Sequence, residues 1–210
     1  MSKKILLLSL CLIFCFVCGC SKTEQVENVE QTKTEEKLKT SEEELKKLPD
    51  NQRFKREYEE YNYDIPLEIV EDNTVSYIDK ENILSVIENK TGIVYFGYPS
   101  CPWCRNAVPI LVETAVANQL PIYYFDLTQF TEVDDTYNSL LEIINKHLGT
   151  ENQDYIDVPL VLTIQNGTIL ASRIGTVGSH TDPYVVMTQD EMLELSQRYQ
   201  EIIDFIKLEN

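Results

Sequence analysis

The sequence is short of basic residues and, beyond its first twenty positions, of cysteines. Its 210 residues include 18 Lys and Arg against 35 Asp and Glu, for a net charge of −17. Because phosphate binding needs clustered Lys and Arg, this balance argues against nucleic acid as a partner. Of six cysteines only Cys101 and Cys104 lie beyond residue 20, which excludes a disulfide framework. The 43% hydrophobic content excludes wholesale disorder and allows one domain with appendages.

The apolar run near the N-terminus is too short for an ordinary membrane-spanning helix. It extends from Ile5 to Val17, broken only by Ser9, and follows Lys3 and Lys4. A basic start followed by an apolar stretch of this length is typical of a secretory signal. We therefore expect the chain to be exported.

The end of this run carries the sequence Val17-Cys18-Gly19-Cys20. It resembles the lipobox of bacterial lipoproteins, in which the final cysteine is acylated and becomes the mature N-terminus. The resemblance implies a signal peptide at residues 1–19 and a lipid on Cys20 that holds the protein to the extracytoplasmic face of the cell membrane. The alternative is an uncleaved signal anchor with incidental cysteines.

Residues 20–53 are predicted to be a disordered acidic tether, and residues 54–210 a folded domain. Ser21 to Asp50 contains no aromatic residue and little apolar content, so it cannot bury enough surface to offset its ordering entropy. A solvent-exposed helix at residues 41–48, with acid-then-base pairs four positions apart, is the alternative for the end of the tether.

The domain alternates short apolar runs with segments of helical periodicity. Strands are expected at 68–70, 74–77, 93–98, 121–126, 158–164 and 168–174, and helices at 79–88, 102–118, 131–148 and 189–207. An Asn166-Gly167 turn joins the last two strands into a hairpin. The alternation followed by a hairpin and a helix predicts an α/β fold, with a mixed sheet flanked by helices on both faces.

The two remaining cysteines form a CxxC pair, placed after an apolar strand and at the start of a helix. Unpaired N–H groups at a helix N-terminus stabilise a thiolate there. Cys101 is therefore the candidate nucleophile, and Cys104, one turn into the helix, is placed to resolve a mixed disulfide with it. Trp103 would lie beside the pair as a docking surface or a lid.

The stretch from Tyr95 to Arg105, with CPWC at its centre, resembles the active-site strand and loop of thioredoxin-like oxidoreductases. Pro109 matches the proline that kinks their active-site helix, and Val158-Pro159 their cis-proline. The resemblance implies a thioredoxin-like fold with a helical insertion before the cis-proline strand. It also implies a redox disulfide between Cys101 and Cys104 that needs no metal or other cofactor.

In that family the cis-proline packs against the dithiol and offers backbone groups to substrate, so Pro159 is placed at the catalytic site and Val158, with Trp103, at the substrate-binding surface. Among its branches, the chain looks most like the exported thioredoxin-like accessory proteins of bacteriocin systems in Gram-positive bacteria. It departs from thioredoxin at Tyr95, which stands where thioredoxins carry a buried acid. A tyrosine cannot accept a proton near neutral pH.

We therefore predict a membrane-tethered thiol–disulfide oxidoreductase acting on exported proteins or peptides. One alternative is a reductant supplied with electrons by a membrane partner. Another is a redox-inactive accessory module that retains the fold and docks a transporter or peptide. Within the pair, Cys101 should be exposed with a lowered pKa, and Cys104 more buried with a higher one.

The CxxC pair also has interpretations that require no redox catalysis. The CxxC could be half of a zinc site with His147 and His180, although their spacing fits no compact finger. It could also be a static disulfide, although so small a loop constrains little of the unfolded chain.

His147 is expected at a helix C-terminus and His180 in a solvated loop. Arg105 either adds positive potential at the cysteines or points to solvent. The tyrosines Tyr58, Tyr61 and Tyr63 are expected to cover the edge of the sheet.

Overall fold

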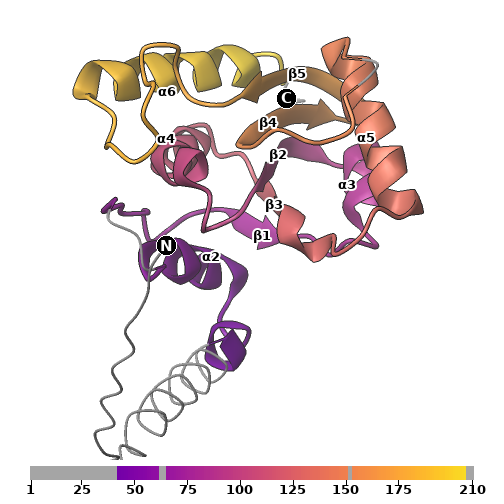
Figure 1. Ribbon diagram of the computed structural model, residues 1–210, viewed down its shortest axis with the longest axis horizontal. Coiled ribbons are helices and arrows are strands. Elements are labelled where there is room, and N and C mark those ends of the chain that lie inside the picture. Colours follow the sequence, from indigo (N-terminus) through magenta and orange to yellow (C-terminus); the bar gives the residue numbers. More distant parts are fainter. Residues whose placement is uncertain (1–41, 62–64, 151–152, 207–210) are drawn as a thin grey trace, which may run out of the picture. The chain divides into compact units, whose positions relative to one another are not determined.

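A computed structural model describes residues 42–61, 65–150 and 153–206 of the chain (Figure 1). The chain divides between Glu43 and Glu44, and every helix and strand from α2 onward belongs to the second unit. The predicted signal peptide 1–19, the lipidation site Cys20 and most of the predicted tether lie outside the described residues.

The second unit alternates strands and helices as the sequence predicts. In chain order its elements are α2 (Asp50–Glu59), β1 (Val75–Tyr77), α3 (Ile83–Asn89), β2 (Thr91–Gly97), α4 (Pro102–Ala117), β3 (Ile122–Asp126), a 3₁₀ turn (Leu127–Gln129), α5 (Asp135–Leu148), β4 (Leu160–Gln165), β5 (Thr168–Ile174) and α6 (Gln189–Ile203).

The strands form one mixed sheet in the order β1-β3-β2-β4-β5. β1, β3 and β2 run parallel, and β4 and β5 complete the sheet as antiparallel strands. β2 lies at the centre, with Tyr95 paired to Tyr124 of β3 on one side and to Val161 of β4 on the other. Because β2 is buried on both faces, its continuous apolar sequence is the pattern expected of a central strand.

Helices cover both faces of this sheet, and successive residues of β2 point to alternate faces. Tyr95 belongs to a core shared with α2, α4 and α6. Phe96 belongs to a second core shared with α3 and α5. The fold is therefore the predicted three-layer α/β arrangement, with the helices seen on either side of the sheet in Figure 1.

The predicted helical insertion before the cis-proline strand is confirmed as α5, which lies between β3 and β4. It starts at Asp135 rather than at Thr131 because Asp134 caps it, with its carboxylate accepting from the N–H of Tyr137 at 2.8 Å. Gly149 ends it with a φ of +70°. The hairpin is also confirmed, and Asn166 and Gly167 both have positive φ.

The folded part of the chain starts earlier than predicted. α2 begins at Asp50, inside the segment 20–53 that was expected to be a disordered tether, and its Phe54 and Tyr58 are fully buried. Asp50 is itself tied to the sheet, because its Oδ2 accepts from the N–H of Tyr77 at 2.9 Å. The predicted boundary at residue 54 is therefore wrong by at least this first turn.

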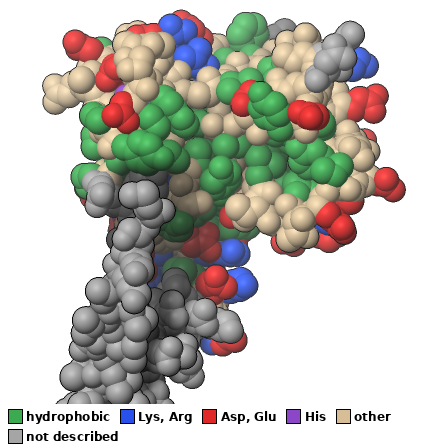
Figure 2. Space-filling model, in the orientation of Figure 1, with side chains coloured by type: hydrophobic (Ala, Val, Ile, Leu, Met, Phe, Trp, Pro, Cys, Tyr) green, Lys and Arg blue, Asp and Glu red, His purple; other side chains and the backbone are tan. Residues whose placement is uncertain are grey.

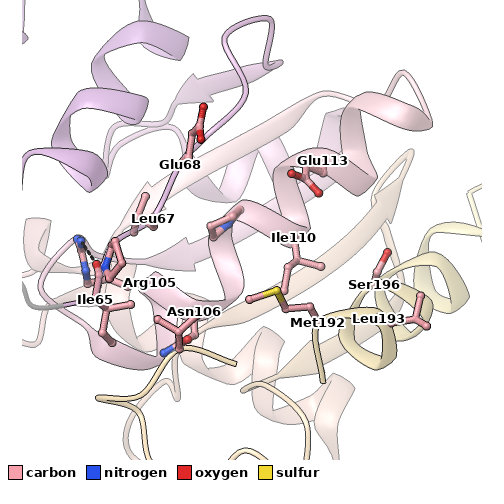
Figure 3. Close-up of a pocket in the computed structure, with 13 residues that line it drawn as sticks. Ile65, Leu67, Glu68, Arg105, Asn106, Ile110, Glu113, Met192, Leu193 and Ser196 are labelled. Carbon is pink, nitrogen blue, oxygen red and sulfur yellow. Dashed lines mark hydrogen bonds between the residues drawn. The ribbon is translucent and has the colours of Figure 1, made fainter. Parts of the chain in front are cut away.

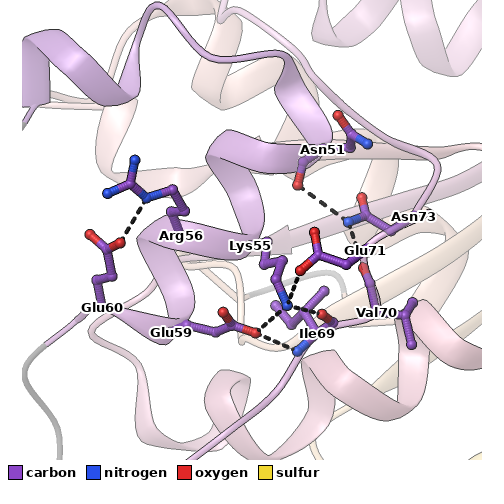
Figure 4. Close-up of polar contacts among 9 residues, drawn as sticks. All are labelled: Asn51, Lys55, Arg56, Glu59, Glu60, Ile69, Val70, Glu71 and Asn73. Atoms are coloured by element: carbon purple, nitrogen blue, oxygen red, sulfur yellow. Dashed lines mark hydrogen bonds and ion pairs between the residues drawn. The ribbon is translucent and has the colours of Figure 1, made fainter.

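Polar contacts fasten α2 to the loop that precedes β1 (Figure 4). Glu59 accepts from the N–H of Ile69 at 2.7 Å and pairs with Lys55 at 2.8 Å. Lys55 also donates to the carbonyl of Ile69, and Asn73 donates to the carbonyl of Asn51 at 3.2 Å. These contacts join the N-terminal helix to the domain as an integral element.

Two smaller expectations are wrong for local reasons. Residues 68–70 do not form a strand, although Ile69 is fully buried. The helix expected from Asp79 begins at Ile83 instead, because residues 79–82 form a turn closed by the N–H of Asn82 donating to the carbonyl of Asp79 at 2.9 Å.

Candidate active site

The CxxC pair lies where the central strand passes into α4. β2 ends at Gly97, and the chain turns so that the N–H of Cys101 donates to the carbonyl of Tyr98 at 3.1 Å. Cys101 is the N-cap of α4, and Pro102 occupies its first position, where a missing N–H costs no hydrogen bond. The predicted placement of the first cysteine at a helix N-terminus is confirmed.

Cys101 carries the thiol that ionises more readily. The pKa of Cys101 is lowered, chiefly by the hydrogen bond from the Cys104 thiol and further by the backbone N–H groups of Cys104 and Trp103, against the opposing effect of burial. The N–H of Cys104 lies 3.2 Å from the Cys101 sulfur. The helix terminus therefore contributes as predicted, but the neighbouring thiol contributes more.

The prediction that Cys101 is exposed is wrong. Only 4% of the residue is accessible, and it belongs to the same core as α2, α4 and α6. Partly buried Tyr98, Trp103 and Val158 pack against this core.

Cys104 is the more buried of the two, as predicted. It has no accessible surface, and its pKa is raised well above the ordinary thiol value, first by burial and then by its hydrogen bond to Cys101. Both cysteines are free thiols. Since the two pKa values are displaced in opposite directions, the geometry assigns ionisation to Cys101 and the proton to Cys104.

The Val158-Pro159 peptide bond is cis, as the resemblance implied. Leu160, the next residue, pairs with Phe96 of β2. Because of this pairing, Pro159 lies beside the end of β2, where the loop to Cys101 begins. Pro159 is also buried. The structure thus brings the predicted catalytic residue Pro159 and the predicted binding residue Val158 to the same end of the sheet as the dithiol.

Trp103 contacts a histidine that the sequence placed in solvent. The rings of Trp103 and His180 are 5.5 Å apart in an edge-on arrangement, and His180 is only 7% exposed. The solvated position expected for His180 is therefore wrong. His147 is hydrogen-bonded to Ser172 at 3.1 Å. Within the described ranges, no group of three or more His, Cys, Asp or Glu side chains is arranged to hold a metal.

Arg105 is a structural residue whose role the sequence did not reveal. It is only 2% exposed, so it is not directed at solvent. Its guanidinium donates to the carbonyls of Tyr58 at 2.6 Å, Ile65 at 3.2 Å and Pro99 at 3.3 Å. One side chain therefore ties α2, the segment after it and the loop before Cys101 to the start of α4.

A cavity of about 430 Å³ opens on the outer side of α4 (Figure 3). It begins at Arg105 and Asn106, directly after Cys104, and its lining is mostly apolar, with Met192 beside Ile110. Asn106 also donates to the carbonyl of Pro183 at 3.0 Å, which fixes the loop before α6 against the active-site helix.

Large apolar side chains are exposed around this region. Tyr184, Val185, Val186 and Leu193 are all largely accessible. On the face drawn in Figure 2, apolar side chains gather in a broad area with acidic side chains near its margins. Such a surface is typical of a site that contacts another protein.

No helix in the described part of the chain is both long enough and apolar enough to cross a membrane.

No protein-family model matches the sequence. The chain is similar to solved thioredoxin structures. The thioredoxin of Aeropyrum pernix is 16% identical, with 60% of this chain and 86% of that one covered and a TM-score of 0.37. The oxidised thioredoxin of Plasmodium falciparum is 16% identical, with 63% and 99% covered and a TM-score of 0.38. Thioredoxin f2 of Chlamydomonas reinhardtii is 15% identical, with 60% and 96% covered and a TM-score of 0.35.

The chain's own features are those that the sequence resemblance implied: a mixed five-stranded sheet, the CxxC at the start of α4 and a cis Val158-Pro159 bond before β4.

Proposed function

We propose that the protein is a membrane-tethered thiol–disulfide oxidoreductase that acts on exported proteins or peptides. The observation that carries the catalytic part is the asymmetry of the dithiol. Cys101 has a lowered pKa at the start of α4, whereas Cys104 is fully buried with a raised pKa, and Pro159 precedes β4 at the same end of the sheet. The signal and lipobox sequence ending at Cys20 supports the tether and the extracytoplasmic location.

The exchange proceeds in two balanced steps. The Cys101 thiolate attacks one sulfur of a client disulfide, which forms a mixed disulfide and releases the other client sulfur as a thiolate. Cys104 then attacks the Cys101 sulfur. The client sulfur bonded to Cys101 leaves and takes up the proton of Cys104. The client disulfide is reduced by two electrons, and Cys101 and Cys104 become a disulfide. In the reverse direction the same bonds change, and a client dithiol is oxidised.

Turnover in either direction needs a second thiol or disulfide to restore the starting state. We propose a membrane protein with a reactive dithiol or disulfide as that partner. The exposed apolar side chains next to α4 support recognition of a protein or peptide client rather than a small thiol.

The function is tested by equilibrating the full chain with glutathione buffers of graded ratio and measuring the Cys101–Cys104 disulfide by mass. We expect full conversion between dithiol and disulfide at a potential between about −270 and −120 mV. The variant with serine at both positions is the control and should show no conversion. A disulfide that stays oxidised even in buffers poised at about −300 mV would be a static structural bridge and would contradict the proposal. Undiminished biological function of the double-serine variant would favour a redox-inactive binding module.

A further inference from the structure

Three buried tyrosines lie in the same hydrophobic core as Cys104. Tyr58 of α2, Tyr95 of β2 and Tyr124 of β3 have no accessible surface. The hydroxyls of Tyr58 and Tyr95 are 3.0 Å apart, and the rings of Tyr95 and Tyr124 stack at 5.5 Å. Three polar groups are thus buried together in the core that also contains Cys104. Burial of so many hydroxyls is costly unless they bond to one another or to a partner.

The Tyr95 hydroxyl reaches the Cys104 sulfur through a gap left by a glycine. The two groups are close enough that each affects the pKa of the other. A Cβ added to Gly97 would stand 2.3 Å from the Tyr95 oxygen and 3.1 Å from the Cys104 sulfur. The absence of a side chain at Gly97 is therefore what allows the hydroxyl, from the same strand, to turn toward the thiol.

A hydrogen bond between these two groups can have only one direction when Cys104 is ionised. A thiolate has no proton and can only accept, so Tyr95 must donate to it, and the Tyr95 oxygen is then free to accept from Tyr58. Burial raises the pKa of Tyr95 well above its ordinary value. Tyr95 consequently keeps its proton under conditions in which a thiolate forms, and it acts as a donor and never as a base.

We propose that Tyr95 is a catalytic hydrogen-bond donor that stabilises the Cys104 thiolate, and that Tyr58 positions it from α2. This inference rests on the proposed exchange reaction. When an incoming thiolate attacks the Cys101 sulfur of the oxidised protein, the disulfide bond breaks and its electron pair leaves with Cys104. The new thiolate is buried, and the Tyr95 O–H group is the side-chain donor that lies near it. The position where thioredoxins carry an acid thus holds a neutral donor here.

The groups that face Cys104 support this assignment. Five titratable side chains interact electrostatically with it: Cys101, Tyr58, Tyr95, Tyr98 and Tyr199. Within the described residues this set includes no carboxylate and no Lys, Arg or His. Stabilisation of a Cys104 thiolate therefore depends on neutral donors: the backbone N–H of Tyr98 lowers the pKa of Cys104 first, and the Tyr95 hydroxyl is the side-chain donor that lowers it further.

The test uses the full chain with Tyr95→Phe, which removes the hydroxyl and keeps the ring. The oxidised protein is mixed with excess dithiothreitol, and reduction is followed by the fluorescence of Trp103, the single tryptophan of the sequence. We expect the rate of reduction to fall about tenfold near neutral pH, since a hydrogen bond to a charged sulfur is lost. Tyr58→Phe should slow the reaction in the same direction by about threefold, because it loosens the donor without removing it.

Tyr199→Phe is the matched control. Its hydroxyl is equally buried and near enough to sense the charge on Cys104, yet it has no hydrogen-bond partner within the described residues. Its rate should stay within about twofold of the wild-type rate, as expected for loss of an unbonded hydroxyl. Equal rates for Tyr95→Phe and Tyr199→Phe would overturn the proposal. If Tyr95→Phe does not fold, Tyr58→Phe decides, and an unchanged rate overturns it.

Failure of this inference is distinguishable from failure of the proposed function. If the wild-type disulfide is not reduced at all, the oxidoreductase function fails. If it is reduced and the tyrosine variants match the wild type, only the role of Tyr95 fails. The pH profile separates catalysis from structure, because loss of the donor should move the rise in Cys104 alkylation of the reduced protein to higher pH, whereas loosened packing alone should speed alkylation at every pH.

Discussion

Replacing Cys101 by serine should reduce thiol–disulfide exchange to the uncatalysed rate, whereas Cys104→Ser should turn the protein into a trap for its client. The reason lies in the opposite environments of the two sulfurs. The pKa of Cys101 is lowered by the Cys104 thiol and by N–H groups at the start of α4, so it supplies the attacking thiolate. Cys104 is fully buried with a raised pKa and acts only on a sulfur already bonded to Cys101.

The measurement is the mass of disulfide-linked adducts after each variant meets a disulfide-containing client or membrane extract. Cys104→Ser should accumulate a mixed disulfide through Cys101 that a reductant releases. Cys101→Ser should form none, and the double-serine variant reports the background. Adducts formed by Cys101→Ser through Cys104 would reverse the assignment of nucleophile and resolving cysteine.

Arg105→Ala should destabilise the domain by about 3 kcal/mol or more, because three buried carbonyls each lose a charged donor and an unsatisfied buried acceptor costs about 1–3 kcal/mol. The guanidinium is 2% exposed and donates to three carbonyls, those of Tyr58, Ile65 and Pro99. Alanine leaves these acceptors buried with one donor fewer each and opens a void between α2 and α4. The same change frees the loop before Cys101, so exchange should weaken in protein that remains folded.

Arg198→Ala is the control for this prediction. The side chain of Arg198 is 40% exposed and pairs with Glu194, one helical turn away, at 2.7 Å. An exposed pair of this kind contributes about 0–1 kcal/mol. Urea unfolding should show a clearly larger loss of unfolding free energy for Arg105→Ala than for Arg198→Ala. A loss for Arg105→Ala no larger than that for Arg198→Ala would contradict the structural role given to Arg105.

The central strand, the CxxC helix and the Asn-Gly hairpin were predictable because each has a short local signature, whereas the cis bond at Pro159 was implied only by the resemblance to thioredoxin-like proteins. The apolar run ending at Gly97 can only be a central strand, and the turn at Asn166-Gly167 fixes the pairing of β4 with β5. The helix α2 was missed because only Phe54 and Tyr58 mark its buried face. Its other side chains are polar and read as a continuation of the tether.

The contacts behind the dithiol were beyond sequence reasoning for a different reason. Tyr58 and Tyr95 are 37 positions apart, and no periodicity links them. Arg105 reads as a surface residue until α2 is seen to cover it. The exposure of Cys101 was misjudged likewise, since the flanking Tyr98 and Val158 come from separate segments. Local signals predict elements, whereas burial at a site depends on which distant elements meet there.

The most direct test of the central claim is alkylation of the reduced full chain with iodoacetamide across a pH series, with each cysteine read by the mass of its own peptide. Because the pKa of Cys101 is lowered, its thiolate fraction rises first as pH increases, and because that of Cys104 is raised, its own follows only at much higher pH. The same protein in urea is the control, where both should titrate alike near about 8.5. The account predicts that Cys101 reacts well below that pH while Cys104 stays unmodified. Reaction of Cys104 first, or of both cysteines together near the ordinary thiol pKa, would contradict it.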